Sequence, residues 1–459
     1  MDGSPRRARV VMGLMFFPRG GSAQVTRALA THLPAQGWDA TVASGSLGHG
    51  GPSDASRFFA GLDLCALDYT EAERAEDPLA HDPPMHPSFE DREDAPDRVF
   101  ARVDEDAYER LVDAWAAQLS RAGAAEADVL HLNHLTPLNQ AAARVAPHVP
   151  VVAHVHGTEL LMLEEIAQGP PAGWDHAQAW RQRMREWADR ASALIALSPS
   201  ALQRLEELLE IDAGRCSVVP NGYDPVTFKP REVDRIAHWR RHLVEAPQGW
   251  KPGGDAGSVS YSPTDLDAFE AGPVLLYVGR YTAVKRIGLL IAAHARARER
   301  FHTRAPLVLL GGFPGEWEGE HPLATIERTG ARDVFLAGWH EHPELPDFLA
   351  ASDAVVLPSV REQFGQVLVE GMACGLPAIA ADAYGPAGIV DDGQTGWLVE
   401  PDDERSLARA LVEAVNDEPE RRRRGQAARD AAQRSYAWPA LAGQVADVYA
   451  EISGEKTRK

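Results

Sequence analysis

Short apolar runs alternate along most of the chain with segments in which apolar residues recur at helical spacing. The run at 10–17 leads through glycines into a segment that carries Val25, Leu29 and Leu33 on one helical face. Such alternation predicts a parallel sheet with helices on its faces, so we expect an α/β fold. The further runs that predict strands are 129–133, 149–156, 192–198, 216–221, 274–280, 307–310, 334–336, 354–357 and 378–380.

Two segments break this pattern. Residues 48–106 lack periodicity and are rich in Pro, Asp, Glu and Arg, and residues 229–271 hold a Pro-Gln-Gly-Trp-Lys-Pro-Gly-Gly stretch between charged segments. We predict that both are insertions exposed as surface loops. The His and Asp residues at 81–86 could suggest metal ligands, but the prolines among them and the lack of a repeated spacing favour a solvated loop.

The stretch 354–380 predicts a compact βαβ unit with two glutamates beside its helix. Glu362 precedes the expected helix start at Gly365, and Glu370 lies on the helix. Unpaired amides at 365–367 can hold phosphate or sugar oxygens, and carboxylates accept hydrogen bonds from hydroxyl groups. A nucleotide sugar offers both kinds of group. The alternative interpretation is a loop charge followed by a solvated helix residue.

This stretch also resembles a known family. Pro358-Ser359, Glu362, Phe364-Gly365, Glu370 and Met372-Ala373-x-Gly375-x-Pro377 resemble the signature of the retaining glycosyltransferases of family 4. The resemblance implies the GT-B fold, in which two Rossmann-like parallel-sheet domains face a central cleft. It further implies that a nucleotide sugar is bound on the C-terminal side and its acceptor on the N-terminal side.

The resemblance also sets the domains and the donor contacts that we expect. It implies donor binding by Glu362, Phe364, Gly365, Gln366 and Glu370. The expected domains are an N-terminal acceptor-binding domain at 1–228, an insertion or linker at 229–271, a nucleotide-sugar-binding domain at 272–435, and a C-terminal helix at 436–459 that crosses back to the N-terminal domain.

Two basic residues follow the predicted strand at 274–280. Arg280 can fork onto phosphate oxygens and Lys285 supplies a point charge, so together they suit a leaving diphosphate. The resemblance implies that both bind the donor and that Arg280, Lys285, Glu362 and His156 are catalytic. Because two cations would replace a metal, we expect no metal ion and no cofactor, with a UDP-sugar favoured over a GDP-sugar as substrate. Taken alone, the two residues would fit a solvated turn.

Polar residues at two strand ends mark the N-terminal half. Gly20 and Gly21 let backbone amides approach an anion. The resemblance implies that they lie against the donor diphosphate or the acceptor, and we expect them to bind the donor, although a glycine turn is often only structural. The dinucleotide pattern of spaced glycines is absent, which disfavours a dehydrogenase. His156, Gly157 and Thr158 stand at the end of the predicted strand at 149–156, where ligands of α/β sheets collect, and the resemblance implies that they bind the acceptor. His156 could instead merely cap its loop.

These features predict glycosyl transfer with retained anomeric configuration. Two other functions stay open: a nucleotide-sugar epimerase of the same fold, and a catalytically silent subunit that binds nucleotide sugars. The presence of Arg280, Lys285, Glu362 and Glu370 disfavours the silent subunit. One position departs from the family, since Gly388 stands where members often have Glu.

Charge and composition limit the kinds of molecule that we expect the protein to bind. With 46 basic and 67 acidic residues the net charge is -21, which opposes binding to nucleic acid and to anionic lipid. The acidic region at 71–109 adds to this, so we expect a soluble small-molecule acceptor and no stable membrane association. Three cysteines without pairing or metal spacing, and the lack of an apolar run long enough to span a bilayer, lead us to expect a cytoplasmic protein.

Overall fold

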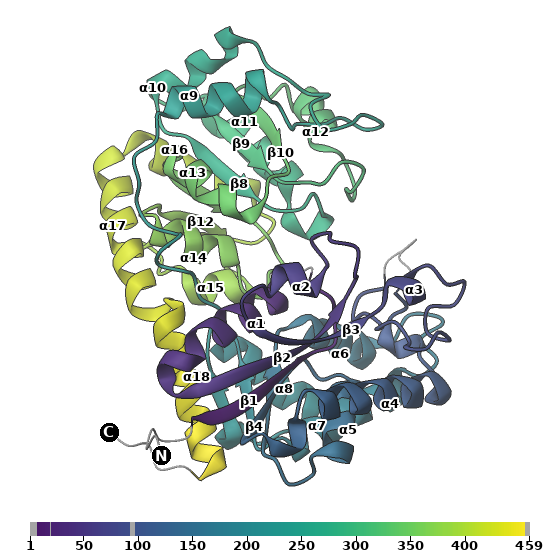
Figure 1. Ribbon diagram of the computed structural model, residues 1–459. Coiled ribbons are helices and arrows are strands. Elements are labelled where there is room, and N and C mark those ends of the chain that lie inside the picture. The colour runs from purple at the N-terminus through teal and green to yellow at the C-terminus, as the bar shows by residue number, and fades with distance from the viewer. Residues whose placement is uncertain (1–6, 19, 92–96, 455–459) are drawn as a thin grey trace. The chain divides into compact units, whose positions relative to one another are not determined.

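The computed structural model describes residues 7–18, 20–91 and 97–454 (Figure 1). The chain forms two compact units. Unit 1 combines residues 1–221 with 438–459, and unit 2 comprises residues 222–437. Each unit is an α/β structure, which confirms the predicted fold class.

Within the described residues, unit 1 holds one sheet of seven parallel strands in the order β3-β2-β1-β4-β5-β6-β7. Its strands are β1 (Ala8–Leu14), β2 (Trp38–Ser46), β3 (Asp63–Asp68), β4 (Val129–Asn133), β5 (Val151–Val155), β6 (Ala193–Ala196) and β7 (Cys216–Val218). Its helices are α1 (Gly21–His32), α2 (Ala55–Phe58), α3 (Thr70–Glu73), α4 (Glu105–Arg121), α5 (Pro137–Val145), α6 (Thr158–Gln168), α7 (Ala177–Arg190), α8 (Pro199–Leu209) and α18 (Trp438–Ser453).

Unit 2 holds a sheet of six parallel strands, again counted over the described residues, in the order β10-β9-β8-β11-β12-β13. Its strands are β8 (Leu275–Val278), β9 (Leu307–Leu310), β10 (Val334–Gly338), β11 (Ala354–Leu357), β12 (Ala378–Ala381) and β13 (Gly396–Val399). Its helices are α9 (Arg235–Arg240), α10 (Ala268–Ala271), α11 (Ile287–Arg298), α12 (Pro322–Thr329), α13 (Leu345–Ala350), α14 (Gln366–Ala373), α15 (Tyr384–Ile389), α16 (Glu404–Asn416) and α17 (Glu418–Ser435).

The strand order creates one switch point in each sheet. In unit 1, β1 lies between β2 and β4, and in unit 2, β8 lies between β9 and β11. The chain therefore leaves each central pair in opposite directions, at β1 and β4 in one sheet and at β8 and β11 in the other. Ligands of open parallel sheets bind at such points.

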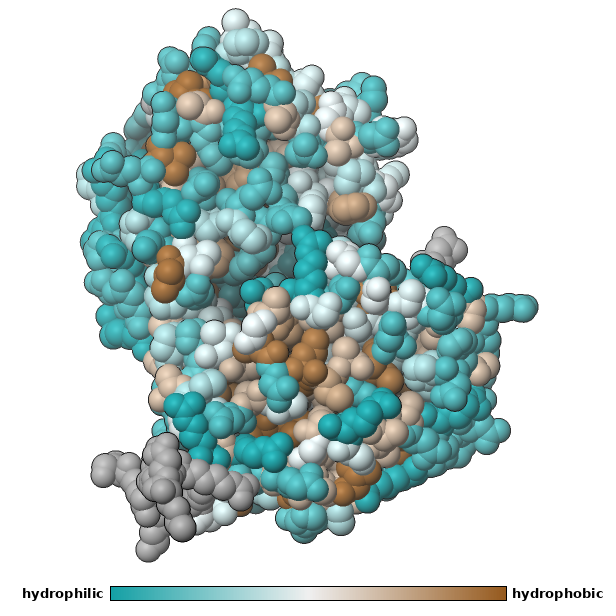
Figure 2. All heavy atoms as spheres, viewed as in Figure 1, coloured by the Kyte–Doolittle hydropathy of each residue, from teal (hydrophilic) through white to brown (hydrophobic). Residues whose placement is uncertain are grey.

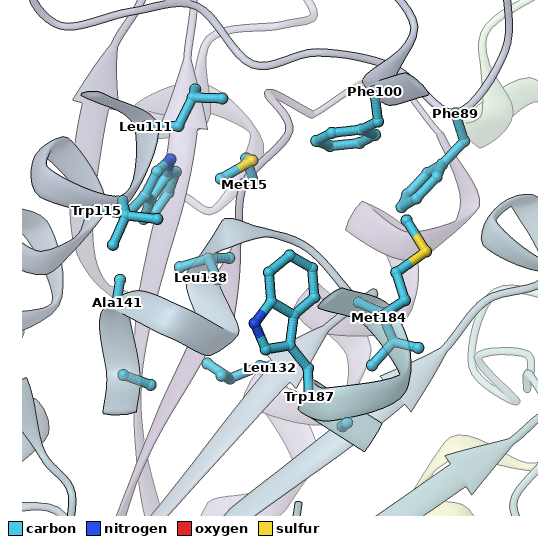
Figure 3. Packing of buried hydrophobic residues seen from close by; sticks show 14 of the residues in the cluster. Met15, Phe89, Phe100, Leu111, Trp115, Leu132, Leu138, Ala141, Met184 and Trp187 are labelled. Carbon is cyan, nitrogen blue, oxygen red and sulfur yellow. The ribbon is translucent and has the colours of Figure 1, made fainter. Parts of the chain in front are cut away.

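The sheet of unit 1 is covered by helices on both faces. Alternate residues of β1 point to opposite sides, so that Met12 packs with α1 and α18 while Val11 packs with α4 and α5. Figure 3 shows part of the second cluster, where Trp115, Leu138 and Trp187 meet the sheet residue Leu132. A sheet with two covered faces explains why its strands β1, β5 and β6 are mostly apolar rather than alternating.

The segment 48–106 is not the exposed loop that its composition predicts. Its aromatic and aliphatic residues enter the core of unit 1, where Phe89 and Phe100 are 5% and 0% exposed. Phe89 packs on Phe16 and Phe100 with ring centroids 5.9 and 4.7 Å apart. The segment also contains β3, whose apolar run at 64–67 was overlooked, whereas Phe89 and Phe100 stand among prolines and charges that give no period.

The segment 229–271 also differs from the prediction of a surface loop. Trp239 and Trp250 are 0% and 1% exposed, and each indole nitrogen donates to a backbone carbonyl, of Ala351 at 3.2 Å and of Gly312 at 2.8 Å. Helix α9 and the π-helix Arg241–Glu245 lie in this segment. Those helices carry the basic residues Arg235, Arg240 and Arg241. The many charges in this stretch of sequence therefore gave no indication that its tryptophans are buried.

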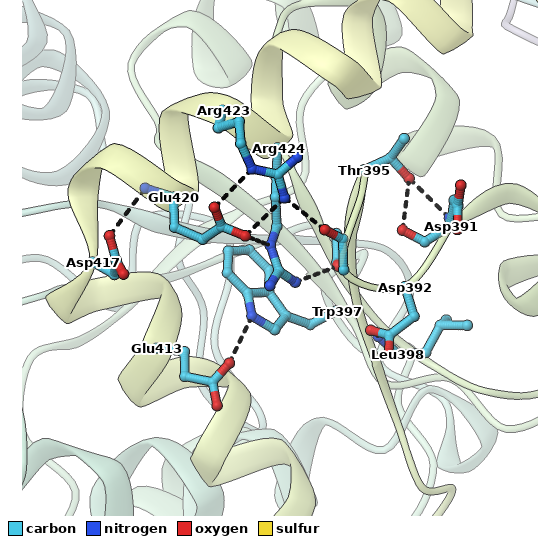
Figure 4. A network of polar contacts seen from close by, with 12 residues as sticks. Asp391, Asp392, Thr395, Trp397, Leu398, Glu413, Asp417, Glu420, Arg423 and Arg424 are labelled. Carbon is cyan, nitrogen blue, oxygen red and sulfur yellow. Dashed lines mark hydrogen bonds and ion pairs between the residues drawn. The ribbon is translucent and has the colours of Figure 1, made fainter.

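The four consecutive arginines at 421–424 lie on α17 and are only partly exposed to solvent. Arg421 is 7% exposed and donates to the carbonyls of Ala414 and Val415 at 2.5 and 3.2 Å. Figure 4 shows Arg423 and Arg424 converging on Glu420, while the Arg424 guanidinium lies 4.1 Å from the ring centre of Trp397. These arginines fasten α17 to the edge of the sheet at β13.

Polar side chains dominate the face drawn in Figure 2, and apolar ones occur in small groups between them. This matches the strong net charge of -21. Over the part of the chain that the structure describes, helices long and apolar enough to cross a bilayer do not occur.

Candidate active site

Two loops meet at the switch point of unit 2. One follows β8 and contains the short turn Ala283–Lys285, and the other follows β11 and leads to α14. The second loop is fastened to the first at Val284, whose carbonyl accepts from the Val360 amide at 3.0 Å and from Ser359 Oγ at 3.2 Å. The structure therefore brings together the basic and acidic residues that the sequence separates by about 80 positions.

Lys285 and Glu362 form an ion pair between these loops. Their side chains are 18% and 19% exposed, so the pair is mostly shielded from solvent but still reachable. Screening by water is weaker at such a depth than at a free surface. An ammonium group held here can exchange its carboxylate for a ligand's phosphate oxygens.

Arg280 stands one turn earlier in the same loop and is exposed. Its backbone is held by the buried Tyr277, whose hydroxyl donates to the Arg280 carbonyl at 2.9 Å. No carboxylate among the described residues pairs with its guanidinium. The loop thus offers one neutralised cation, Lys285, and one unneutralised cation.

Helix α14 begins beside this ion pair. Its N-cap Gly365 has φ +97°, a left-handed conformation that glycine adopts without strain. The first-turn amides of Gln366 and Val367 have no partner within a helix, which makes them donors for an anion or a sugar oxygen. Phe364 is only 5% exposed and packs 6.2 Å from Tyr436, so its ring supports the loop from below.

Glu370 lies one helical turn beyond Gln366 and is 3% exposed. Its Oε1 accepts from His342 Nε2 at 2.8 Å and from Gln366 Nε2 at 3.2 Å. Gln366 also donates to the Gly222 carbonyl at 2.7 Å. Burial with two donors argues against the alternative of a solvated helix residue, and the carboxylate keeps further lone pairs for ligand hydroxyls.

Gly20 and Gly21 lie at the start of α1, after β1 of unit 1. Gly20 is the N-cap, and a Cβ added at either glycine would meet nothing within 4 Å. Packing therefore does not require glycine at either position. Gly388, the position that departs from the family, also faces open space, so that a larger side chain would fit there.

His156 follows β5 and is held at its ring and its backbone. Asn133 Nδ2 donates to the Gly13 carbonyl at 3.0 Å, so its Oδ1 must accept, and His156 Nε2 donates to it at 2.9 Å. Burial, together with neighbouring His154 and His134, keeps the pKa of His156 well below its ordinary value. The ring is therefore neutral, and its Nδ1 carries a lone pair.

Gly157 and Thr158 connect His156 to helix α6. Gly157 is the N-cap of α6 with φ +100°, and Thr158 is the first helical residue. The left-handed glycine allows the chain to turn from strand to helix within one residue. The predicted acceptor-binding trio is thus a strand end, a glycine hinge and a helix start in direct succession.

Sequence patterns did not single out several residues that the structure places at these sites. His342 reaches Glu370 across 28 positions, and Asn133 reaches His156 across 23. A chain of hydrogen bonds also links Tyr449 Oη to His131 Nδ1 at 2.6 Å and His131 Nε2 to His154 Nδ1 at 3.1 Å. The only signal in the sequence is that polar residues end the apolar strands β4 and β5.

Possible metal ligands do not gather in the described residues, where no group of three or more His, Cys, Asp or Glu side chains could hold an ion. Two Asp-x-Asp triplets serve local structure instead. Asp104 accepts from the Ala107 amide at 2.9 Å to cap α4, and Asp265 accepts from the Ser262 amide at 2.7 Å. Neither triplet therefore has its first carboxylate free.

A surface cavity of about 560 Å³ lies away from all these residues. It is lined by Val151 and Ser192, at the amino ends of β5 and β6, and by Trp187 and Arg190 of α7. Ligands of parallel sheets bind at the opposite, carboxyl edge. We therefore place the candidate site at the strand ends and not in this cavity.

Two family profiles match the chain. The profile described as Glycosyltransferase Family 4 matches residues 19–226, and the profile described as Glycosyl transferases group 1 matches residues 263–431. A D-inositol 3-phosphate glycosyltransferase of Stackebrandtia nassauensis is 30% identical over 71% of this chain and 68% of its own length. An alpha-maltose-1-phosphate synthase of Mycolicibacterium smegmatis is 28% identical over 66% of this chain and 74% of its own.

Solved structures share the fold over almost the whole chain. A sucrose-phosphate synthase from Thermosynechococcus elongatus has a TM-score of 0.70 at 20% identity and covers 98% of this chain and 100% of its own. The Anabaena protein HepE, solved in complex with UDP and glucose, has a TM-score of 0.64 at 18% identity and covers 96% of this chain and 99% of its own. These likenesses confirm that the two parallel-sheet units form a GT-B fold.

Proposed function

The chain belongs to glycosyltransferase family 4, and we propose that it transfers a sugar from a UDP-sugar to a soluble small-molecule acceptor, with retained anomeric configuration and without a metal ion. The observation that carries this proposal is the Lys285–Glu362 pair, with Arg280 beside it, at the start of α14. Two cations and a helix N-terminus at one switch point form a site for a diphosphate.

Charge development on the diphosphate explains how these groups would act. As the glycosidic bond breaks, negative charge grows on the leaving phosphate, and Arg280 and Lys285 lie in one loop to receive it. Groups that are already in place stabilise such charge without reorganising in the transition state. Lys285 would exchange Glu362 for phosphate oxygens, and the released carboxylate could then accept a hydrogen bond from a sugar hydroxyl.

Glu370 and His156 would supply the remaining contacts. Glu370, held by His342 and Gln366, would accept hydrogen bonds from the ribose hydroxyls of the donor. The neutral His156 would accept one from a hydroxyl through Nδ1, because its Nε2 is committed to Asn133. Both residues would therefore bind hydroxyl groups of the substrates and not their charged groups.

The acceptor belongs to unit 1 in this proposal. The net charge of -21 opposes adsorption to anionic lipid, which favours an acceptor free in solution. The relatives named as D-inositol 3-phosphate glycosyltransferase and alpha-maltose-1-phosphate synthase point to small phosphorylated or free sugars and polyols as the first acceptors to test. HepE with its bound UDP makes UDP-glucose the first donor to test.

The donor is tested by thermal shift with UDP-, GDP-, ADP- and dTDP-sugars. A ligand that binds only the folded protein raises its melting temperature, and a concentration of about 100 Kd stabilises by about 2.7 kcal/mol. We expect the largest shift with a UDP-sugar, and a smaller one in the variant Glu370→Ala. The variant Glu404→Ala, which loses an exposed partner of Arg296, serves as control. A shift with none of the four sugars would contradict the proposed donor site.

A further inference from the structure

A buried histidine–glutamate pair that the mechanism above does not use lies in unit 1. His134 directly follows β4, and Glu159 lies in the first turn of α6. The Nδ1 of His134 lies 3.2 Å from both carboxylate oxygens of Glu159, and the two side chains are 5% and 0% exposed. Ionisable side chains are rarely buried so deeply unless they are paired, so this pair has a specific role in the folded protein.

The backbone of His134 is itself in an uncommon conformation. Its φ is +67°, in the left-handed region that side chains with a Cβ rarely adopt. The conformation is held because the His134 amide donates to the carbonyl of His154 at 2.8 Å. Residues held in this way cluster at functional sites, and His134 stands at the carboxyl end of β4, at the switch point with β1.

The contact with Glu159 determines which ring nitrogen of His134 carries the proton. The carboxylate can only accept, so Nδ1 carries the proton that it receives. Nε2 forms no hydrogen bond with the residues that the structure describes. It is not among the fully buried polar atoms without a partner, so part of its surface is accessible. The ring is bordered by Phe16, Phe89 and His156 at centroid distances of 5.1, 5.5 and 4.6 Å. Nε2 is thus an accessible acceptor inside an aromatic border.

We propose that His134 binds the acceptor substrate through Nε2, which accepts a hydrogen bond from an acceptor hydroxyl group, and that Glu159 is the positioning residue that holds His134 in this tautomer. The inference rests on the proposed function, because it assigns the acceptor to unit 1. The aromatic border suits the apolar face of a sugar or polyol ring, while Nε2 and the His156 Nδ1 are two hydroxyl acceptors from neighbouring strands.

Glu159 links His134 to His156. Besides His134, it accepts from the His156 amide at 3.2 Å and from Thr158 Oγ1 at 3.4 Å. Burial by itself would raise the pKa of Glu159, but the contact with His134 and the hydrogen bonds from the backbone amides of Glu159 and His156 outweigh it and lower the pKa. An ionised carboxylate therefore holds both histidines from one point, which explains why it lies fully buried.

A matched pair of variants tests the binding role. In His134→Asn the side-chain amide keeps the donor at the place of Nδ1, so the contact with Glu159 survives while Nε2 is lost. The control is His148→Asn, an exposed histidine that contacts only the Ala125 carbonyl near the amino end of β5. The donor is UDP-glucose, and the acceptor probes are D-glucose, D-fructose and myo-inositol.

We expect His134→Asn to raise the acceptor KM about tenfold or more, the effect of one lost hydrogen bond, and to leave the donor KM within about twofold. A purely structural role would instead lower the melting temperature and change both constants. An unchanged acceptor KM in a folded His134→Asn protein would overturn the inference, as would an equal change in His148→Asn.

The tautomer is measured separately, by nitrogen-15 NMR of labelled histidine in the wild-type protein at neutral pH. The signals of His134 are assigned by their loss in His134→Asn, or in His134→Gln if the first variant does not fold. We expect a protonated Nδ1 and a bare Nε2, and loss of that preference in Glu159→Leu. A protonated Nε2 in the wild type would overturn the inference. This measurement tests the assignment of Nε2 as an acceptor without any sugar transfer. Absence of transfer would refute the proposed function and with it the acceptor role of His134, whereas a protonated Nε2 in an active protein would refute the inference alone.

Discussion

At the scale of single residues, the proposed donor site contains two cations that differ in whether a carboxylate of the protein pairs with them. Lys285 is paired with Glu362 and Arg280 is not paired with a carboxylate among the described residues. A ligand phosphate must therefore displace a carboxylate at one cation and only water at the other. Both contacts strengthen as charge develops on the leaving group, so their loss should reduce turnover more than ground-state binding.

Removal of either cation tests this account. We expect Lys285→Ala and Arg280→Ala each to lower kcat by about a hundredfold or more, the usual effect of losing one preorganised contact to a developing anion. Steady-state kinetics with a UDP-sugar measures it, and Lys251→Ala, at an exposed lysine of the segment 229–271, serves as control. Near-normal turnover in both variants would remove the diphosphate from this loop.

The sequence predicted these residues unevenly, for a physical reason. Glu362, Gly365 and Glu370 share one βαβ unit, so their spacing along the chain already implies their spacing in space. His342 lies in the short helix that follows β10 and contacts Glu370 on α14 only in the folded unit. Glu159 contacts His134 because β4 and β5 pair in register. Such partners carry no local period, and polar strand ends were their only trace.

At the scale of elements, three buried histidines lie close together on adjacent strands: His131 in β4, His154 in β5, and His156 just after β5. Burial lowers the pKa of His131 to about 3 and keeps those of His154 and His156 well below their ordinary value near 6.5. The folded protein thus keeps all three neutral in mildly acidic solution, whereas the unfolded chain protonates them below about pH 6.5. Protons taken up only by the unfolded state stabilise it.

Stability should therefore fall as the pH drops from about 6.5 towards 4. Each of these histidines contributes about 1.4 kcal/mol per pH unit to this loss, which is complete for His131 only near pH 3. Urea unfolding at several pH values measures the slope. The variant His131→Gln should reduce the slope by about one proton, while the exposed His148→Gln should reduce it much less. An identical slope in wild type and His131→Gln would show that His131 protonates normally in the folded state.

The segments 48–106 and 229–271 show why composition misled at this scale. Both are dense in charge and proline, and both place isolated aromatic residues into a core built by other elements. An isolated aromatic residue becomes buried, and stabilises the fold, only when distant elements pack around it. The local sequence pattern therefore does not predict its burial. Ten strands were predicted correctly because each is a short apolar run, whereas β2, β3 and β13 were missed. Strand β2 interrupts its apolar residues with polar ones, β3 is a short apolar run between two aspartates, and β13 is a four-residue strand that begins at Gly396.

Truncation of one such aromatic residue distinguishes the two interpretations. We expect Trp250→Ala to destabilise unit 2 by about 3–5 kcal/mol, since the indole is 1% exposed and donates to the Gly312 carbonyl. The control Trp339→Ala removes an indole that is 45% exposed and should cost much less. Urea unfolding followed by circular dichroism measures both. Equal stabilities would restore the prediction of a surface loop.

At the scale of the whole molecule, the chain combines a family 4 glycosyltransferase fold with a net charge of -21 and with cations at its proposed donor site. Arg280 and Lys285 would meet the diphosphate where other enzymes use a divalent ion. We expect glycosyl transfer to persist in excess EDTA, measured as UDP released from UDP-glucose. Activity that disappears with EDTA and returns with magnesium would show that the cations do not suffice.

The central claim is that this chain transfers a glycosyl group with retention. Proton NMR of the reaction mixture tests it most directly, because the coupling constant of the anomeric proton reports the configuration of donor and product in one experiment. With a UDP-sugar whose anomeric bond is axial, the account predicts a product whose new glycosidic bond is also axial. An equatorial product would contradict it.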